Sequence, residues 1–432
     1  MRAPWRPLPC CLLLCLALLP RTGEARSTPS KPRARELGIT FGGRPGPLNA
    51  ITDVPGVEVG HTTLISGEGR LETGKGPVRT GVTAVLPRGR DGVGEPVFAA
   101  MFALNGNGEM TGSHWVAESG QLSGPVMLTN TNDVGTVRDA VIAWAMKRGV
   151  EWELGLPVVA ETWDGQLHDV YGFHVKATHA HQALDGARGG AVAEGSVGGG
   201  TGMMCHGFKG GIGTASRKLP EAEGGYTVGV LVQCNYGSRR LLSVEGVPVG
   251  EEISDLRPCY TGSQKPGNEM FGKIPPCSTS GGVTRPTIPE GAGSIIIVVA
   301  TDAPLLPHQL SRLARRVPLG IGKMGGLGEN ASGDIFLALS TQRLKAPEAA
   351  PVASVSVLDN DRITPLFEAT VQATQEAILN SMLASGTMTG ADGVRIFALP
   401  QDRLVKAMRR YGRLTAVPGT PPKKAAPPRP TP

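Results

Sequence analysis

The sequence predicts an α+β protein in which strands and helices pack in layers. Two runs are rich in apolar and β-branched residues, as is typical of buried central strands: 294–305 (SIIIVVATDAPL) and 334–340 (DIFLALS). The segment Leu366–Leu383 has the apolar spacing of a long amphipathic helix. Strands and helices do not alternate in regular β-α-β units, so a layered α+β arrangement fits best.

Shorter elements are expected between these segments. The sequence Thr131-Asn132-Asp133 supplies side chains that cap helix N-termini, and it precedes a helical pattern over Val137–Met146. The remaining elements are short apolar or amphipathic runs. They are strands at Val82–Leu86, Pro96–Leu104, Leu156–Glu161 and Tyr226–Gln233, and helices at Leu306–Arg316 and Gln401–Arg410.

Both ends of the chain are expected to lie outside the folded domain. Residues 1–25 have the pattern of a signal peptide, with two early arginines, an apolar run too short to span a bilayer, and a small-x-small cleavage site at 23–25. Residues 26–36 are expected to be a mobile lead, and the Pro-rich residues 416–432 a disordered tail. The mature protein is therefore expected to be exported from a bacterial cell, periplasmic or secreted, without a membrane anchor.

The positive charge of the chain is concentrated at these ends. The whole sequence has a formal net charge of +6, and the part from 37 to 415 is left with about −2. A nucleic-acid-binding protein concentrates basic residues on a folded face. Nucleic acid is therefore not an expected partner.

Four cysteines follow the predicted signal peptide, and an exported protein can keep disulfides. Cys259 and Cys277 flank a loop rich in Pro, Gly and Ser, and they form a plausible pair. Cys205 and Cys234 have no such clue. Four unpaired buried thiols explain the sequence equally well.

Two other patterns do not indicate a ligand site. Gly320-x-Gly322-x-x-Gly325 matches a dinucleotide-binding fingerprint, but it follows a predicted helix rather than a strand. Four histidines lie close in sequence without the spacing of a metal site, and we expect them at the surface. They are His168, His174, His179 and His181. No metal and no cofactor are predicted.

The strongest local signal is the boundary between Gly293 and Ser294. The irregular segment 258–293 ends there, and a buried strand begins directly at the serine. If the chain were cut at this bond, the new α-amine of Ser294, with a pKa of about 8, could act as the base for its own hydroxyl. Glycine lets the scissile carbonyl adopt unusual geometry. The spacing alone, however, favours the simpler interpretation of a serine that begins a core strand after a turn.

Several long segments closely resemble the D-aminopeptidase/β-aminopeptidase family of self-processing serine peptidases, the DmpA-type enzymes. Together they extend through most of residues 36–411 in order. They are GGRPGPLNAITDVPGVEVGHTT (42–63), LTNTNDVGTVRDAV (128–141), VVAETWDG (158–165), GGGTGMMCHGFKGGIGTASR (198–217), VGVLVQCNYG (228–237), GSIIIVVATDAPLLPHQLSRLARRVPLGIGKMGG (293–326) and GENASGDIFLALST (328–341).

The resemblance implies a fold and a maturation step. It implies a four-layer αββα sandwich similar to the N-terminal nucleophile hydrolases. It also implies a precursor cut before Ser294 into a large chain (37–293, with 258–293 as processing loop) and a small chain (294–415), which together form one catalytic domain. The cleaved heterodimers would assemble into a homo-oligomer.

The resemblance also implies roles for single residues. Ser294 matches the family nucleophile, and Ser332 and Asp334 match the residues that contact the nucleophile and its amine. Asn235 matches the side-chain amide of the oxyanion hole, and Glu161 a carboxylate that receives the free amino group of the substrate.

Two positions depart from the family pattern. Trp163 stands where relatives have a tyrosine whose hydroxyl lies near the oxyanion, and an indole can only donate through its N–H. Asp334 is one methylene shorter than the glutamate of some relatives. Neither change removes the nucleophile and its amine.

These features together predict an aminopeptidase or amidase that acts through an acyl-enzyme. It would release N-terminal amino acids from small peptides, amides or esters, and the sequence does not choose between L-α, D-α and β-amino substrates. One alternative is an acyltransferase for N-acetylated amino acids, although the related enzymes use threonine as nucleophile. The other is a catalytically silent envelope binding protein, which only Trp163 favours.

Overall fold

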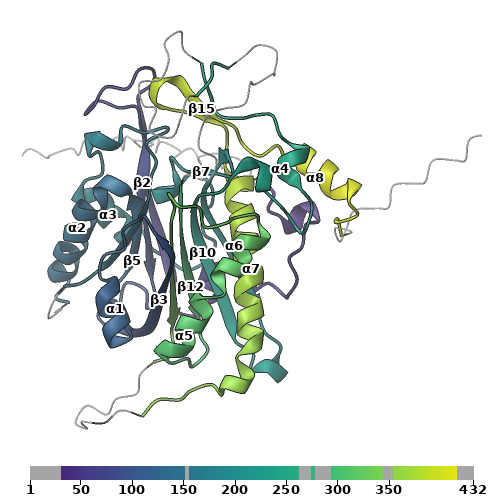
Figure 1. Ribbon diagram of the computed structural model, residues 1–432. Coiled ribbons are helices and arrows are strands. Elements are labelled where there is room, and N and C mark those ends of the chain that lie inside the picture. The colour runs from purple at the N-terminus through teal and green to yellow at the C-terminus, as the bar shows by residue number, and fades with distance from the viewer. Residues whose placement is uncertain are drawn as a thin grey trace, which may run out of the picture. The chain divides into compact units, whose positions relative to one another are not determined.

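Two β-sheets stacked face to face form the centre of the protein in the computed structural model (Figure 1). The structure describes residues 31–150, 155–261, 274–277, 293–343, 352 and 354–415. The described residues from Pro32 onward form one compact unit. The four-stranded sheet has the order β1-β2-β5-β6, formed by Glu58–Ser66, Val78–Leu86, Val126–Asn130 and Val158–Thr162. The six-stranded sheet has the order β4-β3-β13-β12-β10-β9, formed by Gln121–Leu122, Val97–Gly106, Gly333–Ser340, Ser294–Thr301, Thr227–Asn235 and Gly211–Lys218.

Helices cover the outer face of each sheet, which gives four layers (Figure 1). α2 (Val134–Lys147) and α3 (Ala177–Asp185) pack against the four-stranded sheet. α5 (Pro307–Ala314), α6 (Val317–Lys323) and α7 (Thr364–Ala384) pack against the six-stranded sheet. The smaller elements are α1 (Ser113–Ser119), α4 (Val249–Glu252), α8 (Gln401–Arg410), the pair β7 (Met204–Cys205) and β8 (Phe208–Lys209), and the sheet β11-β15-β14 (Cys259–Tyr260, Val394–Ile396, Met388–Thr389).

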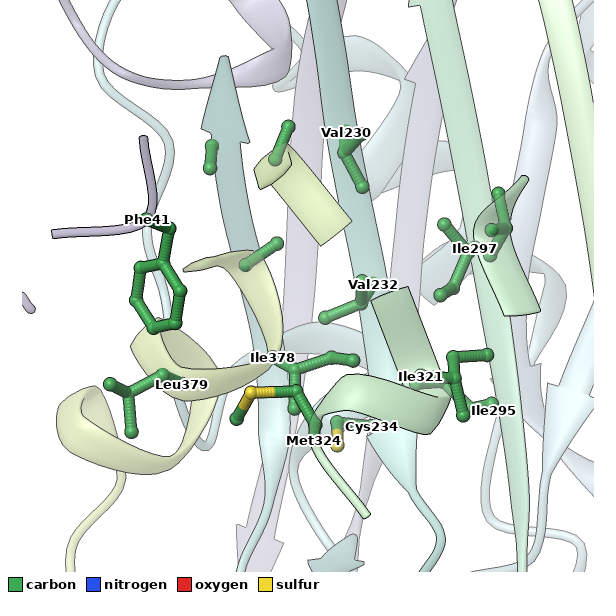
Figure 2. Packing of buried hydrophobic residues seen from close by; sticks show 14 of the residues in the cluster. Phe41, Val230, Val232, Cys234, Ile295, Ile297, Ile321, Met324, Ile378 and Leu379 are labelled. Carbon is green, nitrogen blue, oxygen red and sulfur yellow. The ribbon is translucent and has the colours of Figure 1, made fainter. Parts of the chain in front are cut away.

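The strand β12 shows how the sequence produces these layers. Successive side chains of a strand point to opposite faces. Ile295 and Ile297 therefore belong to the core under the helices, where Figure 2 shows them near Ile321 of α6. Ile296 and Val298 belong to the core between the two sheets. An uninterrupted apolar run is stable at this position because both faces of the strand are buried.

The register of β12 places its first residue between two neighbours. β12 pairs with β13 in parallel, so that Ser294 lies beside Gly333. It pairs with β10 in the antiparallel sense, so that Ser294 lies opposite Asn235. Three chain segments that are far apart in sequence thus meet at one end of the six-stranded sheet.

Every predicted strand and helix is present, with ends that differ from the prediction by a few residues, as the bounds given above show. One prediction of detail is wrong, because none of Thr131, Asn132 and Asp133 caps α2 by its side chain. Instead, the Asn130 side chain accepts hydrogen bonds from the backbone N–H groups of Asn132 and Asp133, which lie in a short 3-10 turn before α2.

The structure also corrects the expected mobile lead. Residues 35–37 form a short 3-10 helix, and Ala34 is fully buried. Arg33 pairs with Glu194 at 2.7 Å and Arg35 with Glu376 at 2.9 Å, so this part of the segment 26–36 is fixed to the domain. The predicted signal peptide, the Pro-rich tail 416–432 and most of the segment 258–293 lie outside the described residues.

Two disulfides are present, Cys259–Cys277 and Cys205–Cys234, so the alternative of four unpaired thiols is wrong. The expectation of surface histidines is wrong for His168, which is buried. Gly320 lies in α6, where a Cβ atom would stand 2.8 Å from Thr374 of α7, so this glycine serves close helix packing. Within the described part of the chain, no helix has the length and apolar character needed to cross a membrane.

Candidate active site

Ser294 stands at the edge of the buried core, at the first position of β12, with 6% of its surface exposed. Its hydroxyl oxygen accepts a hydrogen bond of 3.1 Å from the backbone N–H of Gly333. The rigid strand behind it fixes the backbone, and the neighbouring strand fixes the hydroxyl. A nucleophile needs this kind of fixed position to react efficiently.

The residue before Ser294 has to be glycine. Gly293 has φ +154°, and a Cβ atom at this position would stand 2.1 Å from the backbone carbonyl oxygen of Asn235. Any other side chain would collide with the backbone of β10. The peptide bond between Gly293 and Ser294 therefore lies in close contact with the strand that carries Asn235.

A buried carboxyl lies on the strand next to Ser294. Asp334 of β13 is fully buried, and its Oδ1 accepts a hydrogen bond of 2.6 Å from the hydroxyl of Ser332. Asn105 holds the other side, donating from its amide nitrogen to Oδ2 at 3.2 Å and accepting from the Asp334 backbone N–H at 2.7 Å. Burial raises the pKa of Asp334 to about 6, while the hydrogen bonds from Ser332, Asn105 and the backbone of Ile295 oppose this increase. The Ile295 contact places the carboxyl beside β12, the strand that begins with Ser294.

A side-chain amide lies at the end of the other strand that neighbours β12. Asn235 ends β10 directly opposite Ser294 and is 7% exposed. Its Oδ1 accepts a hydrogen bond of 2.7 Å from the Met204 N–H, and its Nδ2 donates to the Trp163 carbonyl at 2.9 Å. An amide nitrogen carries two hydrogens. Among the described residues, no protein group accepts the second one.

A second buried carboxyl comes from the four-stranded sheet. Glu161 of β6 is 3% exposed. Its oxygens accept hydrogen bonds from the Thr131 hydroxyl and, at 3.0 Å, from the Glu109 N–H. Burial raises its pKa, the two hydrogen bonds oppose that increase, and the nearby Glu109 carboxyl adds to it.

Gly108 lies close to both this carboxyl and Gly333. A Cβ atom on Gly108 would stand 3.2 Å from Glu161 Oε1 and 3.2 Å from the Gly333 Cα, and Gly333 is the residue that donates to Ser294. The absence of a side chain at Gly108 therefore leaves the two halves of the site close together.

Trp163 takes part through its backbone. Its carbonyl oxygen is the group that accepts from Asn235, while its ring packs against Gly165, where an added Cβ would stand 2.3 Å from the ring. The indole is half-buried. The substitution that departs from the family pattern thus leaves the contact with Asn235 intact, because a backbone carbonyl does not depend on the side chain.

The predicted site residues lie at or next to strand ends, and these strand ends from the two sheets meet on one side of the molecule. The structure also adds three groups that the sequence did not reveal. They are Asn105, which holds Asp334; Thr131, which holds Glu161; and the backbone N–H of Met204, which holds Asn235. The stretch 128–141 resembles the family, but nothing in its amino-acid sequence predicts that Thr131 contacts a carboxylate on β6. The described residues contain no group of three or more His, Cys, Asp or Glu that could hold a metal ion.

The arrangement has the parts needed for acyl transfer. A fixed hydroxyl can attack a carbonyl, an amide N–H opposite it can stabilise the oxyanion, and a carboxyl beside it can accept a hydrogen bond from an amine. The second carboxyl can bind a positively charged group of a substrate. All of these groups are buried, which strengthens their electrostatic interactions.

A family model described as Peptidase family S58 matches residues 49–396. The chain belongs to this family. It is 53% identical over 388 residues to the β-peptidyl aminopeptidase BapA of Sphingosinicella microcystinivorans, a match that covers 89% of this chain and 94% of that protein. The protein of the same name from Sphingosinicella xenopeptidilytica is 46% identical, with 88% and 91% covered.

Solved structures agree with this membership. The β-aminopeptidase of a Burkholderia species is 45% identical with a TM-score of 0.75, covering 88% of this chain and 99% of that one. The L-aminopeptidase D-Ala-esterase/amidase of Ochrobactrum anthropi is 41% identical with a TM-score of 0.76, covering 89% and 100%, and is described as a new variant among the Ntn hydrolase fold. The predicted family and the predicted sandwich are confirmed, and the chain is a hydrolase of the peptidase class.

Proposed function

We propose that this protein is a self-cleaving aminopeptidase and amidase whose nucleophile is the N-terminal Ser294 of its small chain. The observation that carries the proposal is the position of Ser294. It follows an obligatory glycine, begins a central strand, and lies between the Gly333 N–H and the Asn235 amide. A serine that merely starts a core strand would not need this surrounding set of polar groups.

Maturation would be an acyl shift followed by hydrolysis. The Ser294 oxygen attacks the Gly293 carbonyl carbon, the C–N bond breaks, and the glycine acyl group is now an ester on the serine. The nitrogen that leaves takes up a proton and becomes the α-amine of Ser294. Water then hydrolyses the ester, which leaves a carboxylate on Gly293 and restores the Ser294 hydroxyl.

Turnover would use the same serine with its freed amine as base. The amine takes the proton from the Ser294 hydroxyl during attack on the substrate amide, and then gives it to the leaving amine. The Ser332 hydroxyl, just before β13, and the Asp334 carboxyl, on β13, would orient the amine and stabilise its protonated form. The free N–H of Asn235 would bind the oxyanion, and water would release the acyl group.

Substrate recognition would depend on Glu161. A carboxylate that is almost completely buried favours a partner with positive charge. The ammonium group of a peptide N-terminus has that charge and three N–H donors. The relatives named as aminopeptidases support a substrate with a free amino group. We propose small peptides, amino acid amides and amino acid esters as the substrate class.

Export and assembly complete the proposal. The signal peptide predicted at 1–25 would deliver the protein to the periplasm or the medium, and two disulfides are consistent with an oxidising compartment. The mature form would be a homo-oligomer of cleaved heterodimers.

Intact mass and N-terminal sequencing of the purified protein would test the proposal, with Ser294→Ala as the matched control. We expect two fragments, the smaller beginning Ser-Ile-Ile-Ile, and hydrolysis of an amino acid p-nitroanilide. The Ser294→Ala variant should stay uncut and lose all measurable activity. An uncut and inactive wild type would contradict the proposal and favour a binding protein. A cut protein that transfers the acetyl group of an N-acetylated amino acid, without aminopeptidase activity, would favour an acyltransferase.

A further inference from the structure

The oxyanion amide of Asn235 is oriented by two backbone groups of opposite character. The Met204 N–H can only donate a hydrogen bond, so it must face the side-chain oxygen of Asn235. The Trp163 carbonyl can only accept, so it must face the side-chain nitrogen. A flipped amide would place donor against donor and acceptor against acceptor. The position of the remaining N–H therefore depends on where Met204 lies.

Met204 belongs to a small hairpin that is separate from both main sheets. The strands β7 and β8 pair only with each other among the described strands, joined by His206 and Gly207, which both have positive φ. An isolated two-stranded hairpin is at best marginally stable in water. Its position against β10 must therefore come from other contacts.

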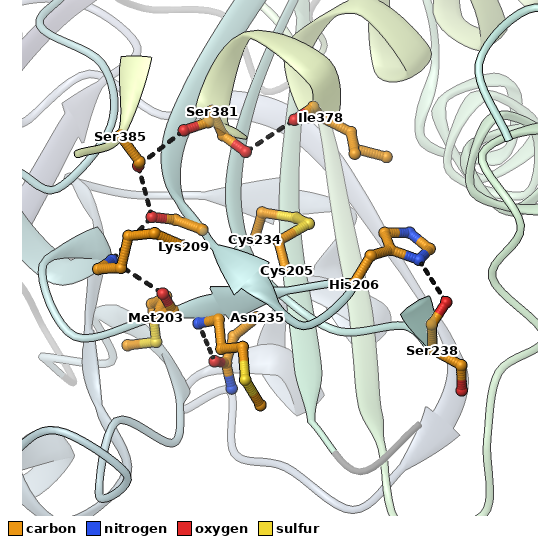
Figure 3. The surroundings of a disulfide bond; sticks show 12 residues. Met203, Cys205, His206, Lys209, Cys234, Asn235, Ser238, Ile378, Ser381 and Ser385 are labelled. Carbon is orange, nitrogen blue, oxygen red and sulfur yellow. Dashed lines mark hydrogen bonds between the residues drawn. A yellow bond between two sulfur atoms is a disulfide. The ribbon is translucent and has the colours of Figure 1, made fainter. Parts of the chain in front are cut away.

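A covalent bond and a backbone hydrogen bond join the hairpin to the end of β10, and a buried lysine holds the hairpin itself together (Figure 3). The backbone N–H of His206 donates to the Tyr236 carbonyl at 2.7 Å. Cys205, the residue after Met204, forms a disulfide with Cys234, the residue before Asn235, and both cysteines are fully buried. The Lys209 ammonium, also fully buried, donates to the carbonyl oxygens of Met203 and Gly210 at 2.8 Å each. The disulfide thus lies one residue away from both ends of the hydrogen bond that orients the amide.

We propose that the β7–β8 hairpin is a positioning element for the oxyanion amide, and that the Cys205–Cys234 disulfide fixes it to β10. The proposal rests on the proposed function, because it assigns Asn235 to the oxyanion. Neither cysteine touches the reacting atoms. Their effect on the reaction passes through the Met204 N–H and the side-chain oxygen of Asn235.

A positioning role predicts a kinetic effect different from that of a general stabiliser. An oxyanion donor acts mainly in the transition state, so a displaced donor lowers kcat more than it changes KM. Displacements of about 1 Å in an active site can cost about a hundredfold in rate. Loss of the disulfide should therefore lower kcat by about tenfold to a hundredfold, with KM changed less than about threefold.

The two disulfides of the protein provide a matched pair of variants. Cys205→Ala/Cys234→Ala removes the bond beside Asn235, and Cys259→Ala/Cys277→Ala removes one that closes a loop of comparable length, with a sequence separation of 18 against 29. Both double variants should lose similar thermal stability. For each we would measure the fraction that begins at Ser294, kcat and KM on an amino acid p-nitroanilide, and the midpoint of thermal unfolding.

A chemical version of the experiment avoids any new side chain at the hairpin. In the Cys259→Ala/Cys277→Ala protein, incubation with a water-soluble phosphine just below the unfolding midpoint exposes the buried Cys205–Cys234 bond transiently. The phosphine, the disulfide and one water molecule then give two thiols and the phosphine oxide. Mass spectrometry after thiol alkylation gives the reduced fraction. We expect kcat to fall in proportion to that fraction, and to recover on reoxidation of an unalkylated sample.

The results separate the two proposals. A wild type that neither cuts itself nor hydrolyses the amide would overturn the proposed function, and this inference with it. An active wild type whose reduced or Cys205→Ala/Cys234→Ala form keeps kcat within twofold would overturn the inference alone. The same conclusion would follow if both double variants lost kcat equally, because the loss would then reflect general stability.

Discussion

The two sheets contribute different chemistry to the same site. The six-stranded sheet supplies Ser294, Asp334 and Asn235 from three adjacent strands, and the backbone N–H of Gly333, the residue before Asp334, donates to the Ser294 hydroxyl. The four-stranded sheet supplies Glu161, which is held by a threonine hydroxyl and a backbone N–H. Both sheets bury a carboxyl, and burial raises the pKa of each.

This difference suggests that the two sheets have separate roles in the site. The residues proposed to act on the reacting bond lie on one sheet, and the residue proposed to recognise the substrate lies on the other. The Asn235–Trp163 hydrogen bond, between the end of β10 and the segment just after β6, joins the two halves. Changes on the six-stranded sheet should therefore alter kcat, and changes on the four-stranded sheet should alter substrate choice.

Among changes that leave Ser294 in place, the largest effect is expected from Asn235→Ala. Removal of one oxyanion donor lowers kcat by about 10² to 10³ in comparable enzymes. KM should change little, because the donor acts mainly on the transition state. Kinetics should be normalised to the fraction of chain that begins at Ser294. An increase in KM with kcat unchanged would instead place Asn235 in substrate binding. It would contradict the proposal that the six-stranded sheet acts on the reacting bond.

Asp334 should make stability depend on pH in a specific direction. Its pKa moves from 3.8 in the unfolded chain to about 6 in the folded protein, so the folded state holds the proton longer. The free energy of unfolding should then fall as pH rises from about 4 to about 6, by up to about 3 kcal/mol. In the uncut Ser294→Ala background, urea unfolding should show this slope with Asp334 and a smaller one after Asp334→Asn. Equal slopes would mean that the carboxyl is not desolvated.

Glu161→Gln should change recognition while leaving the chemistry intact. A charge-assisted hydrogen bond contributes about 1.5–3 kcal/mol. The specificity constant kcat/KM for an amide with a free amine should therefore fall by about tenfold to a hundredfold. A matched ester with hydrogen in place of the amine should be hydrolysed at an unchanged rate. If both substrates lost activity equally, Glu161 would act on the reaction itself.

The smallest effect is expected from Trp163→Tyr. The contact with Asn235 uses the backbone carbonyl, which the substitution keeps. We expect kcat to change less than about fivefold, within about 1 kcal/mol. An increase of more than tenfold would show that a phenolic hydroxyl supplies a donor that the indole does not, which would sharpen the role of this position.

The sequence predicted the strands and the long helices because their apolar patterns reflect burial directly. An unbroken run such as 295–300 requires cover on both faces, and the structure provides it. Asn235 and Glu161 came only from the family resemblance. A single asparagine before a Tyr-Gly pair, or a glutamate at a strand end, has no pattern that separates it from an ordinary surface residue.

The contacts missed from the sequence are those that depend on tertiary proximity. Asn105 reaches Asp334 across 229 positions of sequence, and Cys205 meets Cys234 through the placement of a hairpin. The fixed lead was missed for the same reason, since Arg33 and Arg35 appear as solvated charges until Glu194 and Glu376 are found beside them. Local composition favours mobility there, and long-range ion pairs override it.

The place of β12 and β13 in the six-stranded sheet has a consequence for how the two polypeptides would stay together after the proposed cleavage. Both strands follow the proposed cut, yet they lie between β3 and β10, which precede it. After cleavage, the two central strands of this sheet would belong to the smaller polypeptide, and the strands on both sides of them to the larger one. The two polypeptides could not separate without breaking the strand pairing of a sheet that is buried on both faces. The break in the chain would thus free one amine while the molecule as a whole kept its architecture.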